Sequence, residues 1–135
     1  MVSFNVFSQD DPVSWTFESE TIDDITTVIS LKAKIDKGWF IYSQHTDAGG
    51  PIPTSIELTA STNGDLIGEF EEKGEMILQY NELFEVDVMK FKDQVDFVKH
   101  MDKIETDLLV TGSIIYMACD SEKCLPPKTI EFEIN

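Results

Sequence analysis

Apolar and polar residues alternate with a period of two along much of this chain. Between Ile29 and Ile35 every second residue is apolar, while Ser30, Lys32 and Lys34 take the other face. Alternation of this kind is typical of a β-strand with one buried face and one solvated face. This feature restricts the chain to folds built from half-buried strands.

Similar runs recur along the sequence and are separated by turn-forming residues. They cover residues 13–17, 39–43, 56–60, 86–90, 95–97, 108–117 and 129–134. We expect turns at 36–38, 72–74 and 92–93, and a loop at 47–53, because Gly, Pro, Asp or charged residues gather there. Both faces of the run at 108–117 are mostly apolar or small, so we expect a central strand there. Seven to nine short strands and no convincing helix predict an all-β fold, an immunoglobulin-like antiparallel β-sandwich, in which turns recur about every 8–12 residues.

Size and charge narrow the possible functions. The 135 residues, 41% of them hydrophobic, are typical of one domain, and we expect a single domain over residues 1–135. A formal net charge of −16 repels phosphate backbones, so no nucleic acid is expected as a partner. No apolar run approaches the roughly 20 residues that span a bilayer, and we expect no direct membrane insertion of this domain. The start of the chain has no basic or apolar stretch, so a signal segment is expected to be absent from it.

The chain has two cysteines, Cys119 and Cys124, separated by four residues after the last long apolar run. They are close enough to form a disulfide if the chain turns back on itself. Such a bond would act either as a structural staple or as a reversible redox centre. Stability alone is a weak reason to keep it, because closing so short a loop contributes roughly 2 kcal/mol.

Other uses of paired cysteines find little support. Tetrahedral zinc takes four ligands, and the remaining soft donors, His45 and His100, stand in no ligand-like spacing. A cysteine nucleophile would need a base and an orienting partner, and none stands out. We therefore expect no metal and no cofactor.

Charges beside the cysteines affect their reactivity. Asp120 and Glu122 disfavour a thiolate, while Lys123 partly offsets them next to Cys124. Free thiols here should be slow nucleophiles. A slow thiol still serves in an electron carrier if a docked partner activates it, because exchange also depends on access and geometry.

The cysteines belong to a longer pattern: Tyr116, then the small residue Ala118 directly before Cys119, an acidic gap, Cys124 and then Pro126-Pro127. With its flanks, over residues 110–127, this pattern resembles the amino-terminal periplasmic domain of DsbD, a membrane-embedded thiol:disulfide interchange protein. Two further stretches, 11–17 and 36–43, add to the resemblance, which spans nearly the whole chain.

The resemblance implies an immunoglobulin-like domain that accepts electrons relayed across a membrane and passes them to periplasmic disulfide-handling proteins. It would act as a protein-disulfide reductase component, a role that includes electron supply to cytochrome c biogenesis. Its partners would be thioredoxin-like proteins or domains and a transmembrane electron-transfer partner. The alternative is a non-catalytic immunoglobulin-like interaction module whose disulfide is a local clasp. A cytosolic redox sensor is a third interpretation.

The resemblance also implies roles for the two cysteines. Cys124 matches the family cysteine that forms mixed disulfides with partners, and Cys119 matches the one that resolves them. Tyr116 and Pro126, on either side of the pair, would belong to its surroundings.

Aromatic residues elsewhere in the chain match the family's active-site surroundings. Phe40 and Tyr42 match an aromatic pair that packs beside the disulfide. The stretch Tyr80-Asn81-Glu82-Leu83-Phe84 matches a cap loop, with Phe84 as the aromatic cap and Glu82 as its acidic residue. The resemblance therefore implies that Phe84 covers the cysteines.

Overall fold

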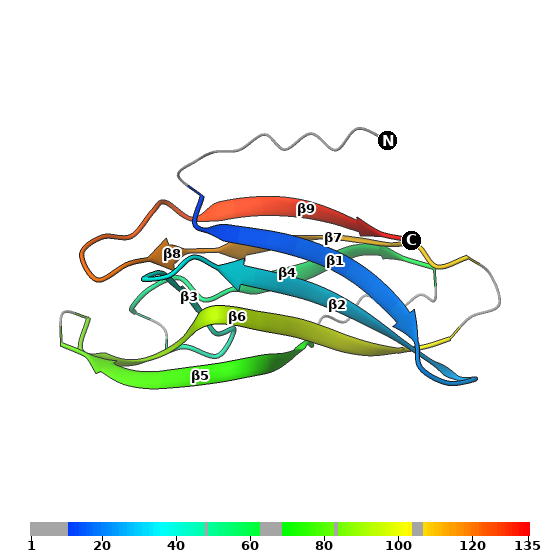
Figure 1. Cartoon of the computed structure of the whole chain (residues 1–135), viewed down its shortest axis with the longest axis horizontal. Helices are drawn as coiled ribbons and strands as arrows, with labels where there is room; N and C mark the ends of the chain where they lie inside the picture. Colours follow the sequence, from blue (N-terminus) through cyan, green and yellow to red (C-terminus); the bar gives the residue numbers. More distant parts are fainter. Residues whose placement is uncertain (1–10, 48, 63–68, 83, 104–106) are drawn as a thin grey trace.

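The computed structural model of the chain describes residues 11–47, 49–62, 69–82, 84–103 and 107–135. Over these ranges it consists of strands and their connections (Figure 1), with no helix long and apolar enough to cross a membrane. The strands are β1 (Val13–Thr21), β2 (Thr26–Ile35), β3 (Phe40–Tyr42), β4 (Ser55–Ser61), β5 (Glu71–Asn81), β6 (Val86–Asp102), β7 (Val110–Tyr116), β8 (Ala118–Cys119) and β9 (Lys128–Ile134).

The strands form two antiparallel sheets. One is six-stranded, with the order β1-β2-β6-β3-β8 and β5 also paired to β6, and the other is three-stranded, with the order β4-β7-β9. β6 is the longest strand: one edge pairs with β5, while the other pairs with β2 at residues 94–102 and with β3 at Lys90 and Phe91. The large sheet therefore branches at β6. Its short branch, β3–β8, contains Cys119.

The core lies between the two sheets and uses the faces that the alternation predicts. In β2, Ile29, Leu31, Ala33 and Ile35 are buried. In the central strand β7, Gly112 leaves no room for a side chain, because a Cβ atom there would lie 2.4 Å from the carbonyl oxygen of Glu57. The predicted all-β, immunoglobulin-like sandwich is confirmed.

The turn expected at residues 72–74 is wrong. These residues lie inside β5, an 11-residue strand at the edge of the large sheet. An edge strand with little covering it shows no contrast between a buried and a solvated face, and Met76, Leu78 and Tyr80 are all exposed in β5. Period-two alternation is therefore a poor indicator of this strand.

The turn expected at Lys92-Asp93 is also wrong. Both residues lie inside β6, where Asp93 has a φ of 65°. The register of the β5–β6 pair shifts between Gly74 and Met76, close to this point. The feature is a bulge, which bends a strand without ending it.

The expectation for residues 108–117 holds in part. β7 is central, since it pairs with β4 on one side and β9 on the other. Its outer face, however, is only partly covered: Thr111 and Ser113 are half-buried, and Ile115 is 38% exposed. An apolar residue such as Ile115 therefore does not mark a buried face here, because β-branched residues also favour strands where they are exposed.

Candidate functional site

The chain changes sheets immediately before the first cysteine. β7 ends at Tyr116 in the small sheet, and β8 joins the large sheet, where Cys119 pairs with Phe40 of β3. The chain then reverses, and Cys124 forms an isolated antiparallel bridge with Cys119. The hairpin between β8 and β9 lies at the same end of the molecule as the connection between β5 and β6 (Figure 1).

The two cysteines form a disulfide within this hairpin, with an S–S distance of 2.00 Å and a Cα–Cα distance of 3.9 Å. Backbone hydrogen bonds lie on both sides of the pair, from Leu125 N–H to the Ala118 carbonyl at 2.9 Å and from Asp120 N–H to the Lys123 carbonyl at 2.8 Å. The cysteines therefore occupy a non-hydrogen-bonded position of the ladder, where facing side chains come closest. This register accounts for a disulfide between residues five apart in sequence.

The two sulfur-bearing residues differ in accessibility. Cys119 is only 3% exposed and packs in a small buried cluster with Tyr42 and Val88, whereas Cys124 is exposed. An incoming thiolate can therefore reach Cys124 more easily than Cys119. This asymmetry matches the roles that the resemblance implies for the two residues.

Asp120 organises the segment between the cysteines. Its carboxylate accepts hydrogen bonds from the backbone N–H groups of Glu122 at 2.8 Å and Lys123 at 2.7 Å. The hydrogen bond from Glu122 is the main reason that the pKa of Asp120 lies below its ordinary value, and that from Lys123 adds to it. Asp120 is therefore charged at neutral pH, and its charge next to Cys119 disfavours a thiolate there.

A hollow of about 610 Å³ surrounds the disulfide, and we call it the cysteine hollow. Besides residues 119–124 it is lined by Phe40, Tyr42, Pro51, Gln79, Asn81, Phe84 and Lys90. The structure thus brings three of the predicted aromatic residues together with the cysteines.

Phe84 stands at the connection between β5 and β6 and is 41% exposed. Its backbone N–H donates to the side-chain oxygen of Asn81 at 3.1 Å. Gly50 lies close to this connection: a Cβ atom at Gly50 would lie 2.9 Å from Cγ2 of Val86 and 3.7 Å from Cβ of Phe84. The position of Phe84 therefore depends on a close approach between two connecting segments.

Glu82 is not among the residues that line the cysteine hollow. It is exposed and lines a neighbouring hollow of about 350 Å³ together with Tyr80 and Val88. Tyr42 and Lys90 line both hollows. Leu83 lies outside the described residues.

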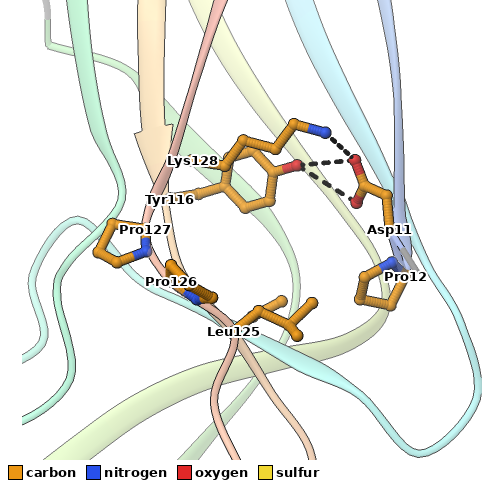
Figure 2. A pocket seen from close by; sticks show the side chains of 8 residues that line it. Asp11, Pro12, Tyr116, Leu125, Pro126, Pro127 and Lys128 are labelled. Carbon is orange, nitrogen blue, oxygen red and sulfur yellow. Dashed lines mark hydrogen bonds and ion pairs between the residues drawn. The ribbon is translucent and has the colours of Figure 1, made fainter. Parts of the chain in front are cut away.

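Tyr116 and Pro126 line a third hollow, of about 300 Å³, with Asp11 and Lys128 (Figure 2). The Tyr116 hydroxyl donates to the Asp11 carboxylate at 3.4 Å, and Lys128 forms an ion pair with Asp11. Burial, with the nearby Asp11 charge, raises the pKa of Tyr116 to about 12. This hollow also includes Ala118 and Leu125, so Tyr116 lies beside the base of the hairpin.

Sequence reasoning missed Lys90 as a site residue. Its Nζ lies 4.0 Å from the centre of the Phe40 ring, and burial lowers its pKa. A sequence signal was present: Lys90 follows Val88 by two residues in a strand, so both share a face, and Val88 is buried. Lysine is seldom buried unless it is paired, so a lysine on a partly buried face marks a candidate site residue.

The two histidines of the chain do not form a metal site with the cysteines in the described residues. His45 and His100 are both exposed. In the parts of the chain that the structure describes, no three His, Cys, Asp or Glu residues are grouped so as to hold a metal ion.

Two packed antiparallel sheets with a disulfide hairpin at one end define an immunoglobulin-like domain with a cysteine pair of which one member is exposed. No family model and no curated protein matches the sequence. Among solved structures, the chain is similar to the N-terminal domain of DsbD from Neisseria meningitidis in its reduced form. The TM-score is 0.61 at 14% identity, over 96% of this chain and 89% of that one.

The chain is also similar to the N-terminal periplasmic domain of ScsB from Proteus mirabilis, with a TM-score of 0.58 and 14% identity. This match covers 96% of the chain and 48% of the ScsB structure, so the chain spans about half of that structure. At such low identity the likeness shows the fold, and it confirms the DsbD-like fold that the sequence predicts.

Proposed function

We propose that this chain is a single thiol:disulfide interchange domain that works in the periplasm. It accepts electrons from a membrane reductase or a thioredoxin-like domain and passes them to extracytoplasmic disulfide proteins through the Cys119–Cys124 disulfide. The observation that most supports this proposal is the asymmetry of the pair, in which a buried Cys119 is bonded to an exposed Cys124. A structural staple has no need of an exposed cysteine.

Exchange proceeds in two steps. A partner's thiolate attacks Sγ of Cys124, the bond to Cys119 breaks, and Cys119 leaves with the electron pair as a thiolate. The partner's second thiolate then attacks the partner sulfur that is bonded to Cys124. A disulfide forms within the partner, and Cys124 is released as a thiolate. Protonation leaves the domain with two thiols, and the reverse sequence passes the electrons on.

The lining of the cysteine hollow suits this chemistry. Phe40 and Tyr42 form an apolar wall beside the disulfide, and Phe84 serves as a cover that a docking partner displaces. Connections between strands open at lower free-energy cost than core elements do. A carrier that must stay reduced among oxidants gains from such a cover, because the Phe84 ring narrows the approach to the cysteines until a docked partner displaces it.

One comparison supports the proposed location, and the charge of the chain supports the kind of partner. The ScsB neighbour is described as a periplasmic domain, which supports a periplasmic location here. The net charge of −16 favours a partner with a basic docking face. Association should then weaken at high ionic strength, since exposed charges are screened beyond about 8 Å at physiological salt.

The proposal is tested by trapping mixed disulfides with a thioredoxin-like protein. Cys119→Ser leaves the exposed sulfur and removes the resolving one, so it should accumulate a covalent complex that reductant releases. Cys124→Ser, the matched control, should accumulate none. If neither variant forms a complex and the wild-type disulfide is not reduced by the partner, the interaction-module alternative is favoured.

A further inference from the structure

Lys90 is the most enclosed cation of the cysteine hollow. Its side chain lies over the ring of Phe40, and Phe40 is the direct strand partner of Cys119. Among the described residues no carboxylate lies within ion-pair distance of Lys90, although the chain has 26 acidic residues and only 10 basic ones. An ammonium group held on a ring, without a carboxylate, is available to another anion in the same hollow.

We propose that Lys90 supplies the positive charge that stabilises the Cys119 thiolate when the disulfide opens, an inference that rests on the proposed function. Cys119 is the sulfur that takes the electron pair in the first step. Because it is buried, water solvates its thiolate poorly, and a nearby cation has a larger effect there than at the surface. The same charge favours Cys119 as the leaving group, since exchange is faster when the leaving thiol has a lower pKa.

The other ionisable groups of the hollow do not supply this charge. Asp120 and Glu122 are negative and oppose a thiolate. Lys123 is exposed, so water and salt screen it, and Tyr42 is a neutral phenol whose pKa burial raises. Lys90 is therefore the cation whose field acts on Cys119 with the least screening.

The environment of Lys90 is consistent with this role. Burial disfavours its charged form and lowers its pKa, so the hollow as it stands holds an incompletely compensated cation. The ring of Phe40 compensates part of the loss through a cation–π contact. A thiolate at Cys119 compensates more of this cost of keeping Lys90 charged. Opening of the disulfide is therefore coupled to the protonation of Lys90.

The test measures the pKa of Cys119 directly. In a Cys124→Ser background Cys119 is the single thiol, and its thiolate is followed by the pH dependence of iodoacetamide alkylation and by absorbance at 240 nm. Lys90→Met should raise the thiol pKa by about one unit, which lowers the thiolate fraction at neutral pH about tenfold. Lys90→Arg keeps the charge and should restore most of the wild-type value.

Lys92→Met is the matched control, because Lys92 is an exposed lysine two residues along the same strand and does not line the hollow. It should leave the pKa of Cys119 unchanged. An unchanged pKa in Lys90→Met, or an equal shift in Lys92→Met, overturns the assignment. If Lys90→Met does not fold, Lys90→Gln is used with the same criteria.

The measurement needs no partner protein, so its outcome is separate from that of the proposed function. If Lys90→Met leaves the pKa of Cys119 unchanged while the wild type exchanges normally, only the role of Lys90 is overturned. A wild-type domain that fails to exchange overturns the function, whatever the pKa of Cys119.

Discussion

Cys119 and Cys124 face each other across a single antiparallel bridge, yet only Cys124 is exposed. In the reduced protein, a bulky maleimide should therefore modify Cys124 at least about tenfold faster than Cys119, because reactivity follows access. Peptide mass spectrometry after brief labelling gives the ratio. Denatured protein is the control and should show similar labelling of both. Equal rates in the folded protein would contradict the asymmetry.

Reduction of the disulfide should change stability only modestly. The closed loop is short, so its loss should lower the free energy of unfolding by about 2 kcal/mol or less. Urea denaturation with and without reductant measures the difference, and the far-ultraviolet signal of the sheets should survive reduction. The Cys119→Ala, Cys124→Ala double variant should behave like the reduced protein. Collapse of the sandwich on reduction would favour the structural-clasp alternative.

Phe84→Ala should expose the thiols without destabilising the core. Oxidation of the reduced pair by a small disulfide should become several-fold faster, because Phe84 lines the cysteine hollow while remaining 41% exposed. The loss of stability should stay below the roughly 3–5 kcal/mol of a truncated core Phe. Leu78→Ala, an exposed apolar residue outside the hollow, is the control and should leave oxidation unchanged.

Gly50→Val provides a second way to move the same cover. The added side chain would meet Val86, since a Cβ atom at Gly50 already comes within 2.9 Å of Val86 Cγ2. The variant should therefore speed oxidation as Phe84→Ala does, with Phe84 itself intact.

One outcome would contradict the role of Phe84 as a cover. If Phe84→Ala loses as much stability as a truncated core Phe and its thiols react at the wild-type rate, Phe84 is a packing residue.

Tyr116 should titrate far above an ordinary tyrosine. Its pKa is raised to about 12 by burial and by the Asp11 charge, against about 10 in the unfolded chain. Its contribution to stability is therefore fully present below pH about 10 and is lost as the pH rises towards 12. Absorbance at 295 nm measures the titration, and Tyr116→Phe should remove the step near pH 12. Loss of a step near pH 10 instead would show that Tyr116 is accessible to water.

The fold could be predicted where one face of a strand is buried. β2 alternates strictly because the core covers one side of it, whereas β5 lies at an edge and exposes residues on both sides. The charged pair Lys92-Asp93 suggested a turn because a bulge and a turn use similar residues, and only pairing with neighbouring strands distinguishes them. Edge strands and bulges depend on tertiary context that a single sequence does not encode locally.

The site could be predicted only where its residues are close in sequence or match the DsbD pattern. The cysteine hairpin is local in sequence, and the resemblance to DsbD pointed to the aromatic residues around it. Lys90 and Asp11 were missed because their partners lie far away in sequence: Lys90 contacts Phe40, and Asp11 contacts Tyr116 and Lys128. Such contacts arise from strand pairing, so no local pattern marks them.

The reduction potential of the Cys119–Cys124 disulfide tests the central claim most directly. The protein is equilibrated with glutathione or thioredoxin redox buffers, quenched with an alkylating reagent, and its oxidised fraction is measured by mass spectrometry. An interchange disulfide should give a potential between about −270 and −120 mV, the range of known exchange proteins. A potential below about −300 mV, with the disulfide intact in every buffer, would identify a structural bond and contradict the proposed function.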